Sequence, residues 1–557
     1  MVEAGPVTHR ECAVLLILVL CGATLRSWGL TRTGLDHFDE GVYAFSALGL
    51  ADGSQPHRLY PEQIKFSPAV YFGALGLVYG LFGPSDLAAI SLNVVLGTLT
   101  IPLVWWVGRR WFGPPAAAAA AALLCFSEFH IALCRTALTD VAFACFFVAA
   151  IAAVAAAMQR RTFAPTVLAG LLVGLTWNTK YHGWLPLLFA LPDLLWWRKD
   201  HPQETGRHPL WTWLAIACIA AACYLPWVLF IQSHPGGYAA FSQYQLTNLG
   251  IRKMAVGHIF SAWSRNFWRQ ADQQLFLEGP FSCAAPLLAM LFAGLVCRRS
   301  ARMSPGYAGT LAIATVSPWW IGGSGTAALI CILALPRLFR DRMHVLGRLL
   351  FGCLLFWMVC APLYNPYARL ILPFNVATFI LAGTWIGRAG STKQSNGMSA
   401  RTLVPAIALL AILVFTLSFW KPDPSNPWRP SDSVARAATR MKDLIPVGSR
   451  VIVIGEPALA FYLHLEDRPA FERVDVASQI GAIKDPVYLV TGVYVHRAPK
   501  PHEMELIQDR LTRVGTFRMD PKDIRVLDDH SPDKARGFRR TPDQTYDLNV
   551  YLLHAEP

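Results

Sequence analysis

The sequence predicts a multi-span α-helical membrane protein that ends in a small α/β domain. Three observations support this prediction. Of the 557 residues, 54% are hydrophobic and only 15% are charged, whereas soluble domains carry about 25% charged residues. Apolar runs recur along residues 1–420, and many approach the roughly 20 residues that a helix needs to cross a bilayer. After Trp420 a proline-rich stretch leads into polar sequence with short strand-like segments.

We expect about thirteen membrane spans from the length of these apolar runs. The first follows Arg10 and lacks a small-residue cleavage site, which favours a retained helix over a signal peptide. Gly322 to Gly325 separates two of the shorter runs. The candidate spans are 12–30, 86–107, 115–133, 141–158, 165–177, 183–197, 210–231, 275–297, 307–321, 325–335, 345–363, 370–386 and 402–419.

The distribution of charge predicts the orientation in the membrane. The 49 Lys and Arg outnumber the 36 Asp and Glu, and the excess lies in short loops of the apolar part, not in one soluble patch. This argues against nucleic-acid binding. Because the basic loops fall between alternate spans, the positive-inside rule puts the N-terminus in the cytoplasm. An odd number of spans then puts the C-terminal domain outside, and we expect the cytoplasmic (inner) membrane as the location.

The twelve cysteines lie between Cys12 and Cys360, mostly within apolar runs. The sequence has no CxxC pair and no Cys/His cluster with zinc spacing. We therefore expect neither a disulfide framework nor a cysteine-based metal site.

The expected domains follow the change in composition. They are a membrane-embedded catalytic domain (1–420), a linker (421–432) and a soluble extracytoplasmic α/β domain (433–557). The membrane domain includes a first outward loop (31–85) and an outward, aromatic-rich loop (232–274), which either lies on the lipid headgroups or packs on its own domain. In the C-terminal domain we expect helices at 433–444 and 501–514 and strands at 450–454, 487–495 and 547–553.

Ionisable residues that interrupt apolar sequence are candidates for function, because charges near lipid are costly. In the first outward loop, Asp39 and Glu40 precede helical sequence. A carboxylate pair there could deprotonate a hydroxyl group or bind a cation, or it could cap the helix.

The other candidates also fall in outward segments. Lys65, Lys180 and Arg369 could meet a phosphate at the membrane surface, or could extend their charged ends to the interface without a further role. Arg135 and Asp140 join two spans and could pair with each other. Because all of these residues are expected on the outer side, we predict one site there for an anionic lipid substrate.

With these residues in this order, the sequence resembles the GT-C membrane glycosyltransferases, in particular the bacterial branch related to protein O-mannosyltransferases and to the aminoarabinose transferase of lipid A. Asp39-Glu40 followed by Tyr43 resembles the family's Asp-Glu-x-x-Tyr. Lys65 with Pro68 resembles its Lys-Pro element, with two residues between them here. The remaining matches are the Arg135 to Asp140 spacing, Lys180 after the fifth span, and Arg369 with Pro373.

The resemblance implies an inverting glycosyltransferase that moves a sugar from a polyprenyl-phosphate carrier to a lipid, glycan or protein hydroxyl on the outer face. It implies Asp39 as the catalytic base, with Glu40 and Asp140 as further catalytic carboxylates. Site residues implied for binding are Lys65, Arg135, Lys180 and Arg369 for the donor phosphate and Tyr43, His182 and Tyr367 for the substrate. The scheme requires no cofactor and no metal, although two carboxylates could hold a divalent ion.

Two alternatives remain. A transporter or flippase would carry ionisable residues at the bilayer midplane and interrupted helices in two matching halves. The Gly322 to Gly325 break fits this class, but the clustering of charges at one face and the lack of two-half symmetry do not. A metal-dependent enzyme similar to the oligosaccharyltransferases would need a clearer set of carboxylates.

Overall fold

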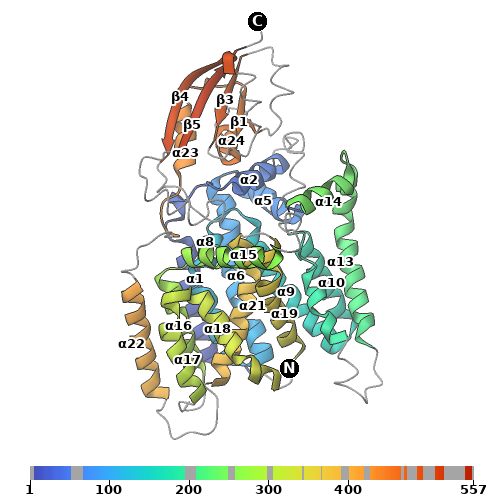
Figure 1. Ribbon diagram of the computed structural model, residues 1–557, viewed down its shortest axis with the longest axis vertical. Helices are drawn as coiled ribbons and strands as arrows, with labels where there is room; N and C mark the ends of the chain where they lie inside the picture. Colours follow the sequence, from blue (N-terminus) through green and yellow to red (C-terminus); the bar gives the residue numbers. More distant parts are fainter. Residues whose placement is uncertain are drawn as a thin grey trace. The chain divides into compact units, whose positions relative to one another are not determined.

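A computed structural model gives the fold of the chain (Figure 1). The structure describes residues 5–51, 67–194, 208–248, 258–297, 305–340, 344–364, 367–389, 400–418, 427–465, 470–472, 486–492, 508–519 and 546–554.

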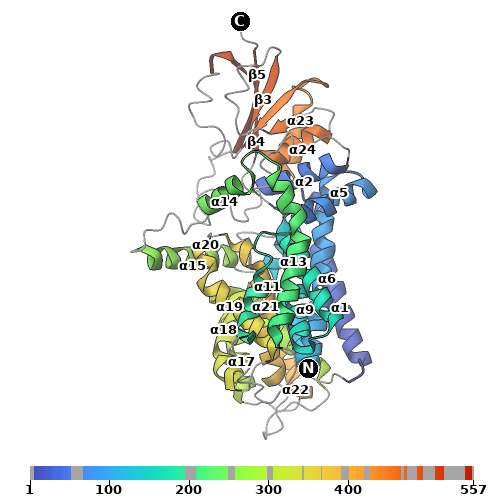
Figure 2. The ribbon, with the colours of Figure 1, turned by 90° about the vertical axis from the view of Figure 1, so that its right-hand side faces the viewer.

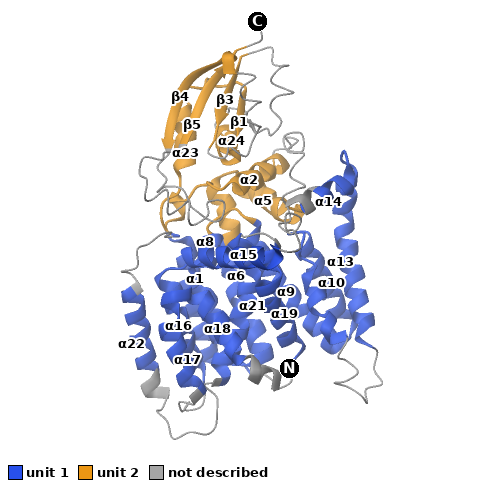
Figure 3. Cartoon of the chain, in the orientation of Figure 1, with its two compact units in different colours: residues 1–28, 94–134, 139–427 blue, residues 29–93, 135–138, 428–557 orange. Residues whose placement is uncertain are grey.

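The chain forms two compact units whose boundaries cut across the sequence (Figure 3). Unit 1 comprises residues 1–28, 94–134 and 139–427, and unit 2 comprises 29–93, 135–138 and 428–557. The first outward loop therefore belongs to the same unit as the C-terminal residues, and the short segment 135–138 joins them. The domain boundaries expected from composition stay a prediction, because composition and contacts divide the chain by different criteria.

Unit 1 is helical, and helix α6 (Asp86–Phe112) enters it from unit 2. Its other helices are α1 (His9–Ser27), α7 (Pro114–Cys125), α8 (Glu128–Cys134), α9 (Thr139–Arg160), α10 (Phe163–Trp177), α11 (Leu185–Phe189), α13 (Pro209–Gln232), α14 (Gly237–Asn248), α15 (Ile259–Phe276), α16 (Pro280–Val296), α17 (Pro305–Val316), α18 (Pro318–Arg340), α19 (Val345–Val359), α20 (Ala361–Tyr364), the 3₁₀ turn η4 (Ala368–Ile371), α21 (Leu372–Ala389) and α22 (Ala400–Ser418).

The prediction of a multi-span membrane protein is confirmed. Among the described residues, six helices are long and apolar enough to cross a membrane, or up to eight if each bent pair forms one span. Several shorter apolar helices accompany them, and the count of about thirteen stays a prediction. Small residues bring the helices close together: a Cβ atom on Gly383 of α21 would lie 2.6 Å from the Ala120 backbone nitrogen of α7.

Helix breaks fall within two of the apolar regions that were expected to span the membrane. The run 115–133 bends by 59° between α7 and α8. Buried Arg26 holds this bend, donating to the carbonyl oxygens of Leu124 (3.1 Å) and Cys125 (3.4 Å), which the broken helix leaves without partners along the chain. In the region 307–335, one helix ends at Val316 and the next begins at Pro318. The break expected at Gly322 to Gly325 is present as a kink at Gly322 (φ 70°) within α18.

Helix α15 runs across the direction of its neighbours (Figure 2) and makes an angle of 87° with α16. One face exposes Phe260 and Trp268, at 78% and 67%, whereas Gln270 and Gln273 on the other face are buried. This two-sided pattern fits a helix in the plane of the membrane interface.

Unit 2 combines helices α2 (Phe38–Ala51) and α5 (Ala69–Phe82) with the C-terminal α/β domain. The domain contains α23 (Ser433–Met441), α24 (Pro457–Leu465) and a five-stranded sheet of order β2-β1-β3-β5-β4. The strands are β1 (Val451–Ile454), β2 (Ala470–Glu472), β3 (Val487–Thr491), β4 (Leu511–Met519) and β5 (Tyr546–Leu553). Strand β1 pairs in parallel with β2 and β3, and β5 pairs antiparallel with β3 and β4.

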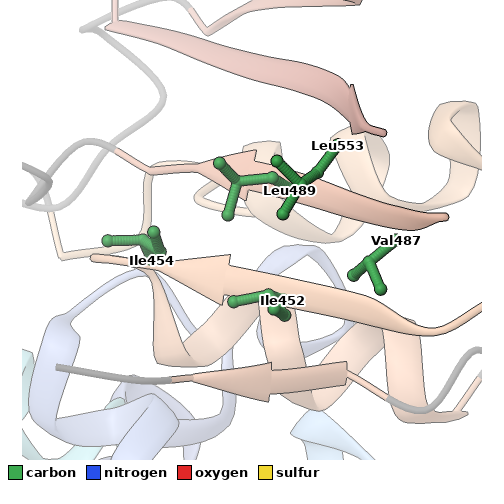
Figure 4. Close-up of a cluster of buried hydrophobic side chains, with 5 residues drawn as sticks. All are labelled: Ile452, Ile454, Val487, Leu489 and Leu553. Carbon is green, nitrogen blue, oxygen red and sulfur yellow. The ribbon is translucent and has the colours of Figure 1, made fainter. Parts of the chain in front are cut away.

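The sheet buries an aliphatic core formed by strands β1, β3 and β5 (Figure 4). Its members are Ile452, Ile454, Val487, Leu489 and Leu553. These strands lie within or overlap the three expected segments, and α23 lies within the helix expected at 433–444.

The helix expected at 501–514 is wrong where the structure describes it. Residues 508–510 form a 3₁₀ turn and strand β4 begins at Leu511. Pairing with β5, which is remote in sequence, decides the conformation, and the register of this pairing shifts between Arg513 and Gly515.

Candidate functional site

Three charged side chains that are far apart in the sequence meet in unit 1. Asp140, in the first turn of α9, accepts a hydrogen bond from the Nζ atom of Lys180 at 2.5 Å through Oδ1. Its Oδ2 atom lies 3.9 Å from Nη1 of Arg369. Asp140 is 1% exposed, and the side chains of Lys180 and Arg369 are 10% and 13% exposed. We call these three residues the Asp140 cluster.

A tight turn after α10 places Lys180. Its backbone N–H donates to the Thr176 carbonyl oxygen at 3.1 Å, and its own carbonyl accepts from the Gly183 N–H at 2.8 Å. A Cβ atom at Gly183 would overlap the Thr176 backbone, so the turn needs glycine there. Asn178 ties the turn to α13 by donating to the Cys223 carbonyl oxygen at 3.0 Å.

The buried face of α15 holds the segment that carries Arg369. The Oε1 atom of Gln273 accepts a hydrogen bond from the Ala368 N–H at 2.8 Å, directly before Arg369. Asn266 and Gln270 donate to the carbonyl oxygens of Pro362 (2.9 Å) and Ala361 (3.3 Å). The polar face of this helix thus satisfies backbone groups at the start of α20 and at the start of η4.

The Asp140 cluster carries one more positive than negative charge. Asp140 orients both cations, and their donors are suited to a second anion. A phosphate brings oxygen atoms that accept charge-assisted hydrogen bonds from an ammonium and a guanidinium group. The small exposure of Lys180 and Arg369 strengthens such bonds, because little water competes for them.

Aromatic rings lie close to both cations of the cluster. The His182 ring packs edge-on against Phe143, with ring centroids 4.5 Å apart. The centroid of the Tyr367 ring lies 5.8 Å from the guanidinium carbon of Arg369. Burial and the nearby Lys180 charge lower the pKa of His182 to about 3. His182 is therefore neutral at physiological pH, so it adds no charge for an anionic ligand.

In unit 2, the two adjacent carboxylates have different environments. Glu40 is fully buried and accepts backbone N–H groups from Asp36 (3.1 Å), His37 (2.9 Å) and Ala137 (2.8 Å). These bonds tie the start of α2 to segment 135–138. These contacts anchor the loop, and they leave the catalytic role expected for Glu40 untested.

Asp39 is the more exposed member of the pair, lying half-buried in the first turn of α2. Its backbone N–H donates to Nδ1 of His37 at 3.1 Å. Tyr43, one turn later, is 4% exposed and packs edge-on against Tyr71. Asp39 is thus the carboxylate better placed to meet a ligand, whereas Tyr43 contributes to the packing of α2 on α5.

Arg135 is fully buried and donates to the Thr33 hydroxyl oxygen at 3.0 Å. Beside it, the side-chain amide of Asn93 donates to the carbonyl oxygens of Thr136 (2.7 Å) and Leu138 (2.6 Å). These contacts stabilise the turn, and they leave the expected phosphate role of Arg135 untested.

The comparisons with known proteins agree with this architecture. Residues 67–230 match the family described as dolichyl-phosphate-mannose-protein mannosyltransferase. The structure is similar to that of ArnT from Cupriavidus metallidurans bound to undecaprenyl phosphate, with a TM-score of 0.52, 14% identity and 97% of each chain covered. It is also similar to the oligosaccharyltransferase AglB from Archaeoglobus fulgidus in complex with an inhibitory peptide and a dolichol-phosphate, with a TM-score of 0.53, 14% identity, and 88% of this chain and 70% of AglB covered.

The chain has the GT-C fold. This confirms the resemblance seen in the sequence. None of the curated proteins compared with the chain matches its sequence significantly.

The family match covers only some of the candidate residues. The matched segment contains Asp140 and Lys180 and ends well before Arg369. Lys65 lies outside the described residues.

Within the described part of the chain, no three His, Cys, Asp or Glu side chains form a group that could hold a metal ion.

Sequence reasoning missed the residues that hold the candidates in place. The most informative are Asn266, Gln270 and Gln273. Their spacing of four and three residues marks one helical face, a signal that could have identified α15 as a helix with a polar buried side. Asn93 and Thr33 have no comparable signal, because each binds segment 135–138 across a large separation in sequence.

Proposed function

We propose that the protein is an inverting glycosyltransferase that moves a sugar from a polyprenyl-phosphate carrier to an acceptor hydroxyl. The observation that carries this proposal is the Asp140 cluster, in which buried Asp140 presents Lys180 and Arg369 together. The family match and the GT-C fold support the same reaction class. ArnT and AglB, which share the fold, were solved with undecaprenyl phosphate and dolichol-phosphate.

The proposed chemistry divides between two groups of residues. When the bond from the anomeric carbon to the carrier oxygen breaks, negative charge develops on the phosphate, and Lys180 and Arg369 stabilise it. The acceptor hydroxyl must lose its proton as it attacks, and Asp39 takes that proton. A single displacement of this kind inverts the anomeric configuration. The donor phosphodiester supplies the driving force, so no nucleotide is needed.

We further propose that transfer requires no divalent metal, since two fixed cations already oppose the phosphate charge. The test is transfer by purified protein before and after treatment with a chelator. Unchanged turnover is expected. A loss that Mg²⁺ or Mn²⁺ restores would instead favour the metal-dependent scheme.

The localisation follows from the same proposal. We propose the inner membrane, with a cytoplasmic N-terminus and an extracytoplasmic C-terminal domain. The basic loops between alternate apolar runs support this orientation. A periplasmically active reporter fused after the last described residue, His554, should be active, and a fusion at the N-terminus should be inactive.

The decisive experiment for the function is transfer in detergent solution. Purified protein is incubated with several polyprenyl-phosphate sugars and candidate acceptors, and product is measured for the wild type and for Asp39→Asn. A glycosyltransferase forms product without any membrane compartment, whereas a transporter or flippase would not. Absence of product for every donor, together with movement of the donor across vesicle membranes, would favour the transporter alternative.

A further inference from the structure

The chain that leads into the C-terminal domain contacts the segment that precedes Asp36, and both belong to unit 2. Thr33 and Ser431 form a parallel β-bridge. The Gly34 N–H donates to the Ser431 carbonyl oxygen at 2.9 Å, and the Ser431 N–H donates to the Arg32 carbonyl oxygen at 2.9 Å. The end of the linker therefore runs alongside the chain just before Asp36.

A single hydroxyl group extends this contact. The Tyr462 side chain, on α24, accepts a hydrogen bond from the Leu35 N–H at 2.8 Å and donates one to Oδ2 of Asp86 at 3.0 Å. Tyr462 is 8% exposed. Burial, and then the neighbouring Asp86 carboxylate, raise the pKa of Tyr462 well above its usual value. The hydroxyl thus keeps its proton at physiological pH and makes both bonds at once.

A second contact follows on the other side of Asp39. Helix α24 lies directly against α2 at Gly41, where an added Cβ atom would be 2.7 Å from the Cα atom of Ala458. The neighbouring atoms belong to the backbone of α24, so they cannot yield by a side-chain rotation. By contrast, a Cβ atom on Gly73 of α5 would meet nothing within 4 Å.

These two contacts bracket Asp39 in the sequence: Leu35 lies four residues before it and Gly41 two residues after it. We propose that the C-terminal domain is a positioning element for Asp39, acting through the Tyr462 hydroxyl and through the close approach of α24 to Gly41. The proposal rests on the proposed role of Asp39 as the base. A base must lie within hydrogen-bond reach of the acceptor proton, and a displacement of about 1 Å can cost about 100-fold in rate.

The test compares Tyr462→Phe with Tyr488→Phe. Both variants remove one phenolic hydroxyl from the same domain, and the Tyr462 ring can keep its packing against Phe461. Tyr488, on β3, makes no side-chain hydrogen bond to the first outward loop among the described residues. We expect Tyr462→Phe to lower kcat by about 10- to 100-fold, with KM for the donor and binding of free polyprenyl phosphate within about twofold of wild type. Tyr488→Phe should match the wild type.

A second pair of variants tests the helix contact and covers the case in which Tyr462→Phe does not fold. Gly41→Ala should lower kcat in the same way, because α2 and α24 must move apart. Gly73→Ala, a mid-helix substitution in open space, should leave kcat unchanged. Wild-type kcat in folded Tyr462→Phe and Gly41→Ala would overturn the proposal.

Combination with Asp39→Asn separates positioning from a general structural effect. If Tyr462 acts through Asp39, the residual rate of Asp39→Asn should not fall further when Tyr462→Phe is added. An equal further fall would show that the hydroxyl acts elsewhere and would overturn the inference. Loss of transfer in Asp39→Asn with full activity in both positioning variants would remove only the inference. Full activity in Asp39→Asn would remove the base itself.

Discussion

Asp140 and Lys180 lie 40 residues apart in the sequence, and the carboxylate of one accepts a hydrogen bond from the ammonium group of the other at 2.5 Å. The pair joins the start of α9 to the turn after α10 and is almost completely buried. Asp140 also pairs with Arg369, so one carboxylate holds two cations.

Lys180→Gln should weaken binding of polyprenyl phosphate by about 10- to 100-fold, since a hydrogen bond to a charged group is worth about 1.5–3 kcal/mol. The measurement is binding of the free carrier to purified protein. Arg348→Gln is the matched control: Arg348 forms an ion pair with Asp193 at the start of α19 and should be dispensable for binding. Equal effects of the two substitutions would remove the phosphate role of Lys180.

Asp140→Asn should destabilise the protein by about 3 kcal/mol, because removal of one partner leaves buried cations without their compensating charge. A lower Tm in detergent measures the effect. Added polyprenyl phosphate should raise the Tm of the variant more than that of the wild type, since the anion replaces the lost charge. An identical ligand-induced rise in both proteins would argue against an anion site at the cluster.

Gln273→Leu should raise KM for the donor several-fold, because the segment that carries Arg369 would be held less firmly. The buried Ala368 N–H would lose its acceptor, at a cost of about 1–3 kcal/mol. Ser264→Ala, on the same helix, is the control, because the described structure contains no hydrogen bond from the Ser264 side chain. Steady-state kinetics with varied donor distinguish this result from a uniform loss of folded protein, which would lower the apparent kcat alone.

Glu40→Gln and Asp39→Asn should differ in kind. The Glu40 carboxylate accepts three backbone N–H groups, and an amide offers one oxygen and a repelling NH₂ group. Glu40→Gln should therefore lower the Tm, with a modest effect on turnover per folded molecule. Asp39→Asn should keep the Tm and lose at least about 100-fold in turnover. Loss of turnover in Glu40→Gln with a lower Tm in Asp39→Asn would instead make Glu40 the base and Asp39 the structural residue.

The low pKa of His182 predicts a pH-dependent stability. In the unfolded chain the imidazole binds a proton near pH 6.5, whereas in the folded protein it stays neutral down to a pKa of about 3. Stability is therefore lost as the pH falls below 6.5, by up to about 2 kcal/mol at pH 5. His182→Gln should show a smaller drop in Tm between pH 7.5 and pH 5. Parallel curves for the two proteins would contradict this account.

Much of the membrane part could be predicted because apolar length and charge asymmetry are local properties of a chain in a bilayer. The candidates Asp140, Lys180 and Arg369 could be found for the same reason: each interrupts apolar sequence where a charge is costly. The helix expected at 501–514 failed where β4 begins, because strand pairing with β5 is a contact across sequence that no local pattern contains.

Apolar length, charge and composition were enough to predict that the chain crosses a membrane several times, that it ends in an α/β domain, and which charged residues interrupt apolar sequence. What each of these residues touches follows only from the folded chain. The fold separated Glu40, bound by three N–H groups, from half-buried Asp39 next to it. It also placed α24 against α2 at Gly41, and it bound the Tyr462 hydroxyl to the Leu35 N–H just before α2. Hydrogen bonds and helix packing act over a few ångströms in space, and residues hundreds of positions apart meet only when the chain has folded.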